Sequence, residues 1–175
     1  MQSILLLSFV MFFKTTLLFD FNKSADISNW RITDDVVMGG RSNGNFQLTA
    51  EGHGLFSGEV SLDNNGGFSS VRYYFTQKET TESNRFVIRL KGDGKVYQFR
   101  VKVKSNDYYD YIISFATTGE WQTVELPFDK MIASFRGQLL NRPPFPGKSM
   151  TEIGFLIGNK KAESFALQID EISIK

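Results

Sequence analysis

Residues 85–104 read RFVIRLKGDGKVYQFRVKVK, and apolar and polar side chains alternate along both halves of this stretch. Successive side chains of a β-strand point to opposite faces of the sheet, so the alternation is typical of strands with one buried side. The GDG at residues 92–94 interrupts the pattern with the glycines that tight turns favour. The stretch therefore predicts a β-hairpin. Its buried face would carry Phe86, Ile88, Leu90, Tyr97, Phe99, Val101 and Val103.

The opposite face of the expected hairpin is basic. It carries Arg85, Arg89, Arg100 and Lys102, with Lys104 at its end. Like charges directly opposite each other destabilise paired strands unless acidic side chains or a ligand lie over them. Two interpretations stay open: a solvated outer face, which exposed strands often have, and a basic docking surface.

The rest of the chain shows the same short alternating segments, and no stretch keeps a helical apolar period over three turns. The 17 phenylalanines, with six tyrosines and two tryptophans, favour β-structure with an aromatic core. Further strands are expected at residues 17–21, 45–50, 54–62, 68–75, 110–116, 120–127, 151–158 and 164–174. About ten strands with short turns predict an all-β fold of two packed sheets, in one domain of residues 17–175.

Two segments near the C-terminus have special patterns. In FALQIDEISIK, residues 165–175, the apolar alternation changes phase at Asp170 and Glu171, which predicts a β-bulge that keeps both apolar sets on the core side. The stretch FRGQLLNRPPFPGKSM, residues 135–150, holds three of the four prolines and is expected to be an extended surface loop.

Composition excludes several functions. Twenty Lys and Arg against 19 acids give a net charge of +1, which offers no reason to expect nucleic acid or an anionic membrane as a partner. The chain has no cysteine, and its single histidine, His53, lies in a glycine-flanked turn where we expect no catalytic role. No nucleotide-binding loop appears, so no cofactor and no metal are expected. A hydrolase built on two of Asp34, Asp35, Glu59, Asp63 and Glu125 ranks last.

The N-terminal residues 1–16 are treated as an extension. SILLLSFVMFF, residues 3–13, has the length of a signal-peptide apolar region and is too short to span a bilayer as a helix. Lys14 follows this run instead of preceding it, so a weak export signal and a non-functional extension are both open. The compartment, cytoplasmic or exported, depends on which applies.

Two loops combine acids, paired glycines and an arginine: DDVVMGGRSNGNF at residues 34–46 and DNNGGFSSVRYYF at residues 63–75. The paired glycines are Gly39, Gly40, Gly66 and Gly67. Glycine permits a positive φ or a close backbone approach that a side chain would block, so these loops are expected to have defined shapes. An arginine can bind a carboxylate through two parallel hydrogen bonds. Two arrangements stay open: Arg72 contacts Asp34 or Asp35 and so joins the two loops, or each loop folds independently and the arginines lie in solvent.

Four segments resemble the complex I intermediate-associated protein 30 family, in the family's order. They are WRITDDVVMGGRS at residues 30–42, GLFSGEVSLDNNGGFSSVR at 54–72, SFRGQ at 134–138 and EIGFLIGNKKAESFALQIDEISI at 152–174. The resemblance implies a jelly-roll sandwich of the galactose-binding-domain-like type, related in shape to carbohydrate-binding modules. It also implies a non-enzymatic role in assembling respiratory complex I in the mitochondrial members. The matching motif positions are Asp34, Asp35, Met38, Gly39, Gly40, Ser42, Asn65, Gly66, Gly67, Phe68, Ser70 and Arg72, with Arg41 beside them.

A mitochondrial transit peptide is Arg-rich and amphipathic, whereas residues 1–16 are apolar with one lysine, so the chain looks like a compact bacterial-type member. The leading hypothesis is a chaperone-like assembly factor that holds a protein partner, such as a respiratory subunit, through Met38 and Phe68. The alternative is a carbohydrate-binding module in which Trp30 or Trp121 stacks on sugar rings together with Tyr74. A structural calcium ion at Asp170 or Glu171 is a side possibility.

Overall fold

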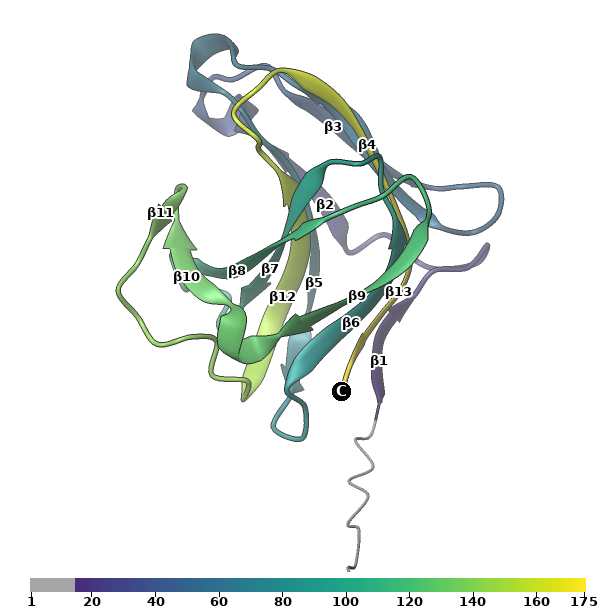
Figure 1. Cartoon of the computed structure of the whole chain (residues 1–175), viewed down its shortest axis with the longest axis vertical. Helices are drawn as coiled ribbons and strands as arrows, with labels where there is room; N and C mark the ends of the chain where they lie inside the picture. The colour runs from purple at the N-terminus through teal and green to yellow at the C-terminus, as the bar shows by residue number, and fades with distance from the viewer. Residues whose placement is uncertain (1–14) are drawn as a thin grey trace, which may run out of the picture.

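The structure is a computed structural model that describes residues 15–175, and these residues form two antiparallel β-sheets packed face to face (Figure 1). The first sheet has six strands: β3 (Asn43–Leu48), β4 (Gly54–Val60), β13 (Glu163–Ile174), β6 (Arg85–Lys91) and β9 (Trp121–Pro127) in spatial order, with β1 (Thr16–Asp20) paired to β13. The second sheet has seven: β11 (Gln138–Leu139), β10 (Ile132–Phe135), β8 (Asp110–Ala116), β7 (Val96–Lys102), β12 (Ser149–Ile157), β5 (Ser69–Glu79) and β2 (Trp30–Asp34).

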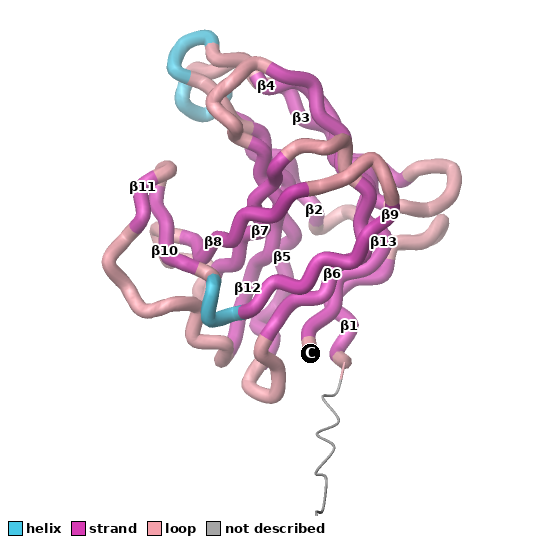
Figure 2. The backbone as a smooth tube through the Cα atoms, in the orientation of Figure 1, coloured by secondary structure: helices cyan, strands magenta, loops and turns pink. Residues whose placement is uncertain are grey.

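Three single-turn 3₁₀ helices lie between the strands: η1 (Asp35–Met38), η2 (Asp63–Asn65) and η3 (Phe128–Lys130). Figure 2 shows that η1 and η2 lie together at one end of the sandwich, although about 25 residues of chain separate them. No helix within residues 15–175 is long and apolar enough to cross a membrane. Residues 1–14, most of the expected extension of residues 1–16, lie outside the described residues. Thr16, at the end of that extension, is already the first residue of β1.

Aromatic side chains fill the space between the sheets. Phe86 of β6 meets Phe99 of β7 with ring centroids 4.8 Å apart, and both side chains are fully buried. At the β2 edge of the seven-stranded sheet, Trp30 stacks on Tyr73 of β5 at 5.0 Å. Edge-to-face and offset pairs of this kind stabilise a core beyond the area that they bury. The prediction of an all-β, two-sheet jelly-roll sandwich is thus confirmed, with thirteen strands instead of about ten.

The prediction of a β-hairpin at residues 85–104 is wrong. The strands β6 and β7 have the predicted buried faces, but β6 pairs with β13 and β9, whereas β7 pairs with β12 and β8 in the other sheet. Packed sheets lie about 10 Å apart, a distance that a four-residue link can span. Residues 92–95 therefore cross the sandwich. Alternation identifies a buried face, but two strands facing each other across a core have the same pattern as two that pair in one sheet.

The C-terminal β-bulge is confirmed. The register between β13 and β6 shifts between Ile169 and Glu171, and the apolar side chains on both sides of the shift are buried. The segment 135–150 is only partly the expected surface loop. Phe135 belongs to β10, residues 138–139 form β11, and the ring of Phe145 is buried against Phe128 and Tyr111. The strands β2, β10 and β11 are short and were not predicted from alternation.

Candidate functional site

A single carboxylate joins the two Gly-Gly loops. Asp35 is fully buried at the start of η1 and accepts hydrogen bonds from the Ser42 amide at 3.0 Å and the Ser42 hydroxyl at 2.5 Å. Its Oδ2 also accepts from the backbone amides of Gly67 at 2.6 Å and Phe68 at 3.2 Å, which follow η2. Burial opposes ionisation of this group, but the bonds from Ser42, Gly67 and Phe68 outweigh burial and lower the pKa of Asp35.

The paired glycines fit around this carboxylate. Gly39 and Gly67 have φ of +91° and +140°, which other residues rarely adopt. Gly40 and Gly66 have no room for a side chain: a Cβ at Gly66 would lie 2.6 Å from Asp35 Oδ2, and one at Gly40 would overlap the same carboxylate. Each pair therefore combines one glycine required by φ with one required by close approach. The predicted reasons for both Gly-Gly pairs are confirmed.

Asp34 holds the neighbouring backbone. Its carboxylate accepts from the Gly44 amide at 2.8 Å and from the Ser69 hydroxyl at 2.5 Å, and the Ser70 hydroxyl donates to the Thr33 carbonyl at 2.7 Å. The chain between β2 and β3 is thereby attached to β5. These contacts account for Asp34, Ser42 and Ser70 of the motif as structural residues, while Arg41, Met38 and Asn65 are exposed.

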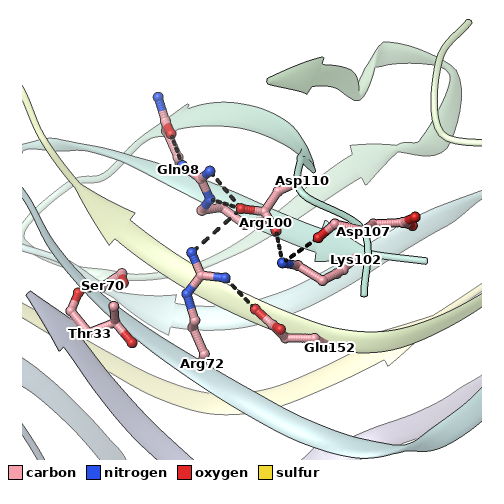
Figure 3. A network of polar contacts seen from close by, with 9 residues as sticks. All are labelled: Thr33, Ser70, Arg72, Gln98, Arg100, Lys102, Asp107, Asp110 and Glu152. Carbon is pink, nitrogen blue, oxygen red and sulfur yellow. Dashed lines mark hydrogen bonds and ion pairs between the residues drawn. The ribbon is translucent and has the colours of Figure 1, made fainter. Parts of the chain in front are cut away.

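The expected contact between Arg72 and Asp34 or Asp35 is wrong. Arg72 lies on the outer face of β5 and donates to Glu152 of β12 at 2.5 Å, and its other terminal nitrogen lies 3.5 Å from Asp110 Oδ2 of β8 (Figure 3). The carboxylates of Asp34 and Asp35 are instead occupied by backbone and hydroxyl donors of the loops. The local sequence could not indicate these two partners, because Asp110 and Glu152 are 38 and 80 residues away from Arg72.

Gly154 allows Arg72 to cross the sheet. It pairs with Arg72 on one side and with Arg100 on the other, so it lies between the two arginines on the outer face of β12. A Cβ at Gly154 would lie 2.6 Å from the Val71 carbonyl oxygen and 3.3 Å from Arg72 Cα and Cγ. The absent side chain leaves the hollow through which the Arg72 guanidinium reaches β8.

Asp110 is the centre of the resulting network. Arg100 donates to its Oδ2 through Nε at 3.1 Å and through a terminal nitrogen at 2.7 Å, and Lys102 Nζ lies 3.5 Å from its Oδ1. Burial disfavours the charged form, but the charges of Arg100 and Arg72 outweigh it and lower the pKa of Asp110. Neither Asp110 nor Glu152 was predicted as a site residue, since each is a single acid in an otherwise ordinary strand.

The network forms part of the lining of a groove of about 730 Å³ on the outer face of the seven-stranded sheet. One side is formed by the two joined loops, with Met38 54% exposed and Leu62 46% exposed. The other side is formed by Tyr108 and by β10 with its turn, where Phe135 lies 5.2 Å from the Tyr108 ring. Figure 1 shows these two sides as arms that project from the sheet. Phe68, half-buried, and Arg72 also line the groove, so several motif residues meet there.

The expected basic face does not exist as one surface. Arg85 and Arg89 lie on the six-stranded sheet, where Arg85 is 3.1 Å from Glu125 and Arg89 is 2.9 Å from Asp170. Arg100 and Lys102 lie on the other sheet, in the groove. The two pairs are separated because β6 and β7 belong to different sheets.

The expected sugar platform is also divided. Tyr74 is exposed on β5, but Trp121 lies on β9 of the other sheet, in contact with the His53 ring at 4.6 Å and beneath the Arg89 guanidinium at 5.3 Å. Trp30 is 5% exposed and belongs to the core. Asp170, a calcium candidate, is in contact with Arg89 and His53, and residues 15–175 contain no group of three or more acids, histidines or cysteines that could hold a metal ion.

Comparison with known proteins gives a consistent result. The sequence profile of the family described as complex I intermediate-associated protein 30 matches residues 19–169. The mitochondrial protein of that name from Drosophila melanogaster is 27% identical, over 93% of this chain and 63% of its own length. The Mus musculus protein is 24% identical, over 88% of this chain and 54% of its own length, so the chain spans little more than half of these relatives.

Among solved structures, the family 11 carbohydrate-binding module of a Clostridium thermocellum cellulosomal cellulase superposes with a TM-score of 0.67. The alignment covers 94% of this chain and 95% of that module, at 17% sequence identity. This likeness establishes the fold alone.

Proposed function

Because the chain belongs to the complex I intermediate-associated protein 30 family, we propose that it is a non-enzymatic, chaperone-like assembly factor that holds a protein partner in the groove. The partner class is a subunit of a respiratory complex, by extension from the names of its relatives. The observation that carries the proposal is the pair of exposed apolar side chains, Met38 and Leu62, on loops that Asp35 joins into one rigid side of the groove.

Exposed apolar side chains on a preorganised loop suit a protein interface. Burying one such side chain contributes about 1.5–3 kcal/mol, and little of this is lost to ordering when the loop is already fixed. Met is adaptable in shape and is common at surfaces that hold chains of varied sequence. Phe68, Phe135 and Tyr108 extend the apolar surface across the groove.

The test is recovery of partners from native lysate by the full chain, with mass spectrometry as the readout. Respiratory subunits should be recovered by the parent and by Leu17→Asp, a control at an exposed leucine of β1 outside the groove, and lost with Met38→Asp and Leu62→Asp. Equal recovery by all four proteins would contradict a partner site in the groove.

A glycan is the second candidate, and the aromatic pair Tyr108 and Phe135 at the edge of the groove favours it. Aromatic faces bind sugar rings, and the neighbour with the same fold is a carbohydrate-binding module. A glycan array probed with the parent and with Tyr108→Ala tests this function: binding that the substitution abolishes would support it.

A further inference from the structure

Positive charge is concentrated in the groove. Its lining within the described residues includes five cationic side chains, Arg72, Arg100, Lys102, Arg136 and Lys160, and one acid, Asp110. When Glu152, which binds Arg72, is included, the excess is three positive charges, whereas the whole chain has a net charge of +1. A groove of one sign attracts an occupant of the opposite sign.

The three cationic side chains at the floor of the groove have acidic partners, whereas the two at its rim have none in residues 15–175. Arg72, Arg100 and Lys102 share Asp110 and Glu152 and are thereby positioned. Arg136, at the turn between β10 and β11, and Lys160, after β12, are exposed, and neither has an acid within ion-pair distance in residues 15–175. The Arg136 guanidinium lies 5.3 Å from the Phe135 ring, a contact that leaves its charge unneutralised, so the charges of Arg136 and Lys160 are both available to a ligand.

A buried donor in the groove wall also lacks a partner. Ser134 is 1% exposed, lines the groove and pairs with Asp110 across β10 and β8. Its hydroxyl has no hydrogen-bond partner in the described part of the chain, and the same is true of Arg72 Nε. A buried hydroxyl without a partner is unfavourable, so a ligand that accepts its hydrogen bond is favoured.

We propose that the groove is a carboxylate-anchoring site for an extended, acidic segment of a protein partner. The segment places Asp or Glu side chains against Ser134, Arg136 and Lys160, and its flanking apolar side chains against Met38, Leu62 and Phe135. This inference rests on the proposed function and names the chemistry of its partner. A neutral glycan would leave the cationic excess without a counterpart, and a phosphate polymer would leave the apolar side chains without one.

The test uses an array of random ten-residue peptides, each paired with a twin in which Asp and Glu are replaced by Asn and Gln. The probe is the fluorescently labelled full chain. Acidic members with apolar neighbours should bind about tenfold more tightly than their amide twins, which corresponds to one charge-assisted hydrogen bond. The difference should shrink as salt is raised from 50 to 500 mM, because both rim cations are exposed to screening.

Variants locate the anchor. Arg136→Gln combined with Lys160→Gln should abolish the preference for acidic peptides, and Ser134→Ala should reduce it without lowering stability. Lys161→Gln is the matched control, because Lys161 adjoins Lys160 but lies outside the groove lining and 3.4 Å from Glu163. Loss of the preference with Lys161→Gln, or its survival in the double variant, would place the anchor elsewhere and overturn the inference.

The outcomes separate the two proposals. Equal binding of acidic and amide twins, abolished by Met38→Asp, would leave protein binding intact and overturn the carboxylate anchor. A mixed-linked glucan or a uronic-acid oligomer that binds while no peptide does would overturn both. Inorganic phosphate at 10 mM should displace acidic peptides from the parent chain. Displacement that is lost in the variant with Arg136→Gln and Lys160→Gln would support a site that recognises the anionic group.

Discussion

Gly154 shows how a residue without a side chain determines where a charged one lies. The Arg72 guanidinium crosses β12 above Gly154 to reach Asp110, and on the way its other terminal nitrogen binds Glu152. Arg72 is largely buried, and partner carboxylates on two different strands compensate for the loss of water. The position of Arg72 in the groove thus depends on a glycine 82 residues later in the chain.

A Gly154→Ala variant tests this arrangement. The added Cβ would meet the Val71 carbonyl and displace Arg72, so we expect a loss of about 1–3 kcal/mol in the free energy of unfolding, as for other overpacked sites. Urea denaturation measures the change. Gly119→Ala is the control, since a Cβ there has no atom within 4 Å and its φ is not positive. Equal midpoints for the two variants would show that the hollow at Gly154 has no structural role.

At the scale of the elements, the bulge in β13 keeps the apolar side chains of both halves of this strand on the core side. Five apolar side chains of β13, on both sides of Asp170, are buried because the extra residue is absorbed at the bulge. Without Asp170, the sequence would alternate regularly from Ile169 to Ile174. The bulge is thus a way to accommodate one extra residue and not a requirement of the core.

Deletion of Asp170 is therefore expected to be tolerated. The variant should unfold cooperatively, because the core side chains keep their places. Both it and Asp170→Ala lose the Arg89 and His53 contacts, and the deletion should be about 1 kcal/mol less stable because it also removes the carbonyl that accepts the Phe21 amide. Deletion of Gln98 from the regular strand β7 should abolish folding, because it turns Phe99 out of the core. Thermal melting followed by circular dichroism distinguishes them, and loss of the cooperative transition on Asp170 deletion would contradict this account.

At the scale of the whole molecule, three carboxylates make stability depend on pH. Asp35, Asp93 and Asp110 are each partly or fully buried, and the donors and cations around them outweigh burial and lower the pKa of each. A carboxylate with a lowered pKa in the folded state contributes stability above its unfolded pKa, near 4, and this stability is lost as the pH falls through the folded pKa.

The melting temperature should accordingly be nearly constant from about pH 7 to pH 5 and fall steeply below about pH 4. Asp110→Asn should lower stability at pH 7 by about 3 kcal/mol, because Arg100 and Lys102 lose their carboxylate partner and Arg72 keeps only Glu152. It should also make the acid-side decline shallower. Differential scanning calorimetry across this range provides the measurement. An identical acid-side slope in the variant would rule out Asp110 as a contributor.

Part of the site follows from local sequence. The paired glycines and the acids beside them predicted shaped loops, and the structure gives each glycine the expected reason, because a turn and its capping acid lie within a few residues of each other. The partner of Arg72, the placement of the basic residues on one face and the grouping of Trp121 with Tyr74 were predicted wrongly. Each of these depends on which strand lies beside which, and side-chain alternation does not contain that information.

The sequence by itself determined the class of fold, the buried face of most strands, the bulge in β13 and the family, since periodicity and short motifs are local properties of the chain. Only the tertiary structure decided that residues 92–95 cross between sheets, so that Arg100 and Lys102 join Arg72, Asp110 and Ser134 in one groove. The physical reason is that strand pairing is set by the packing of the whole core. Two strands facing each other across that core bury the same side chains as two that pair side by side.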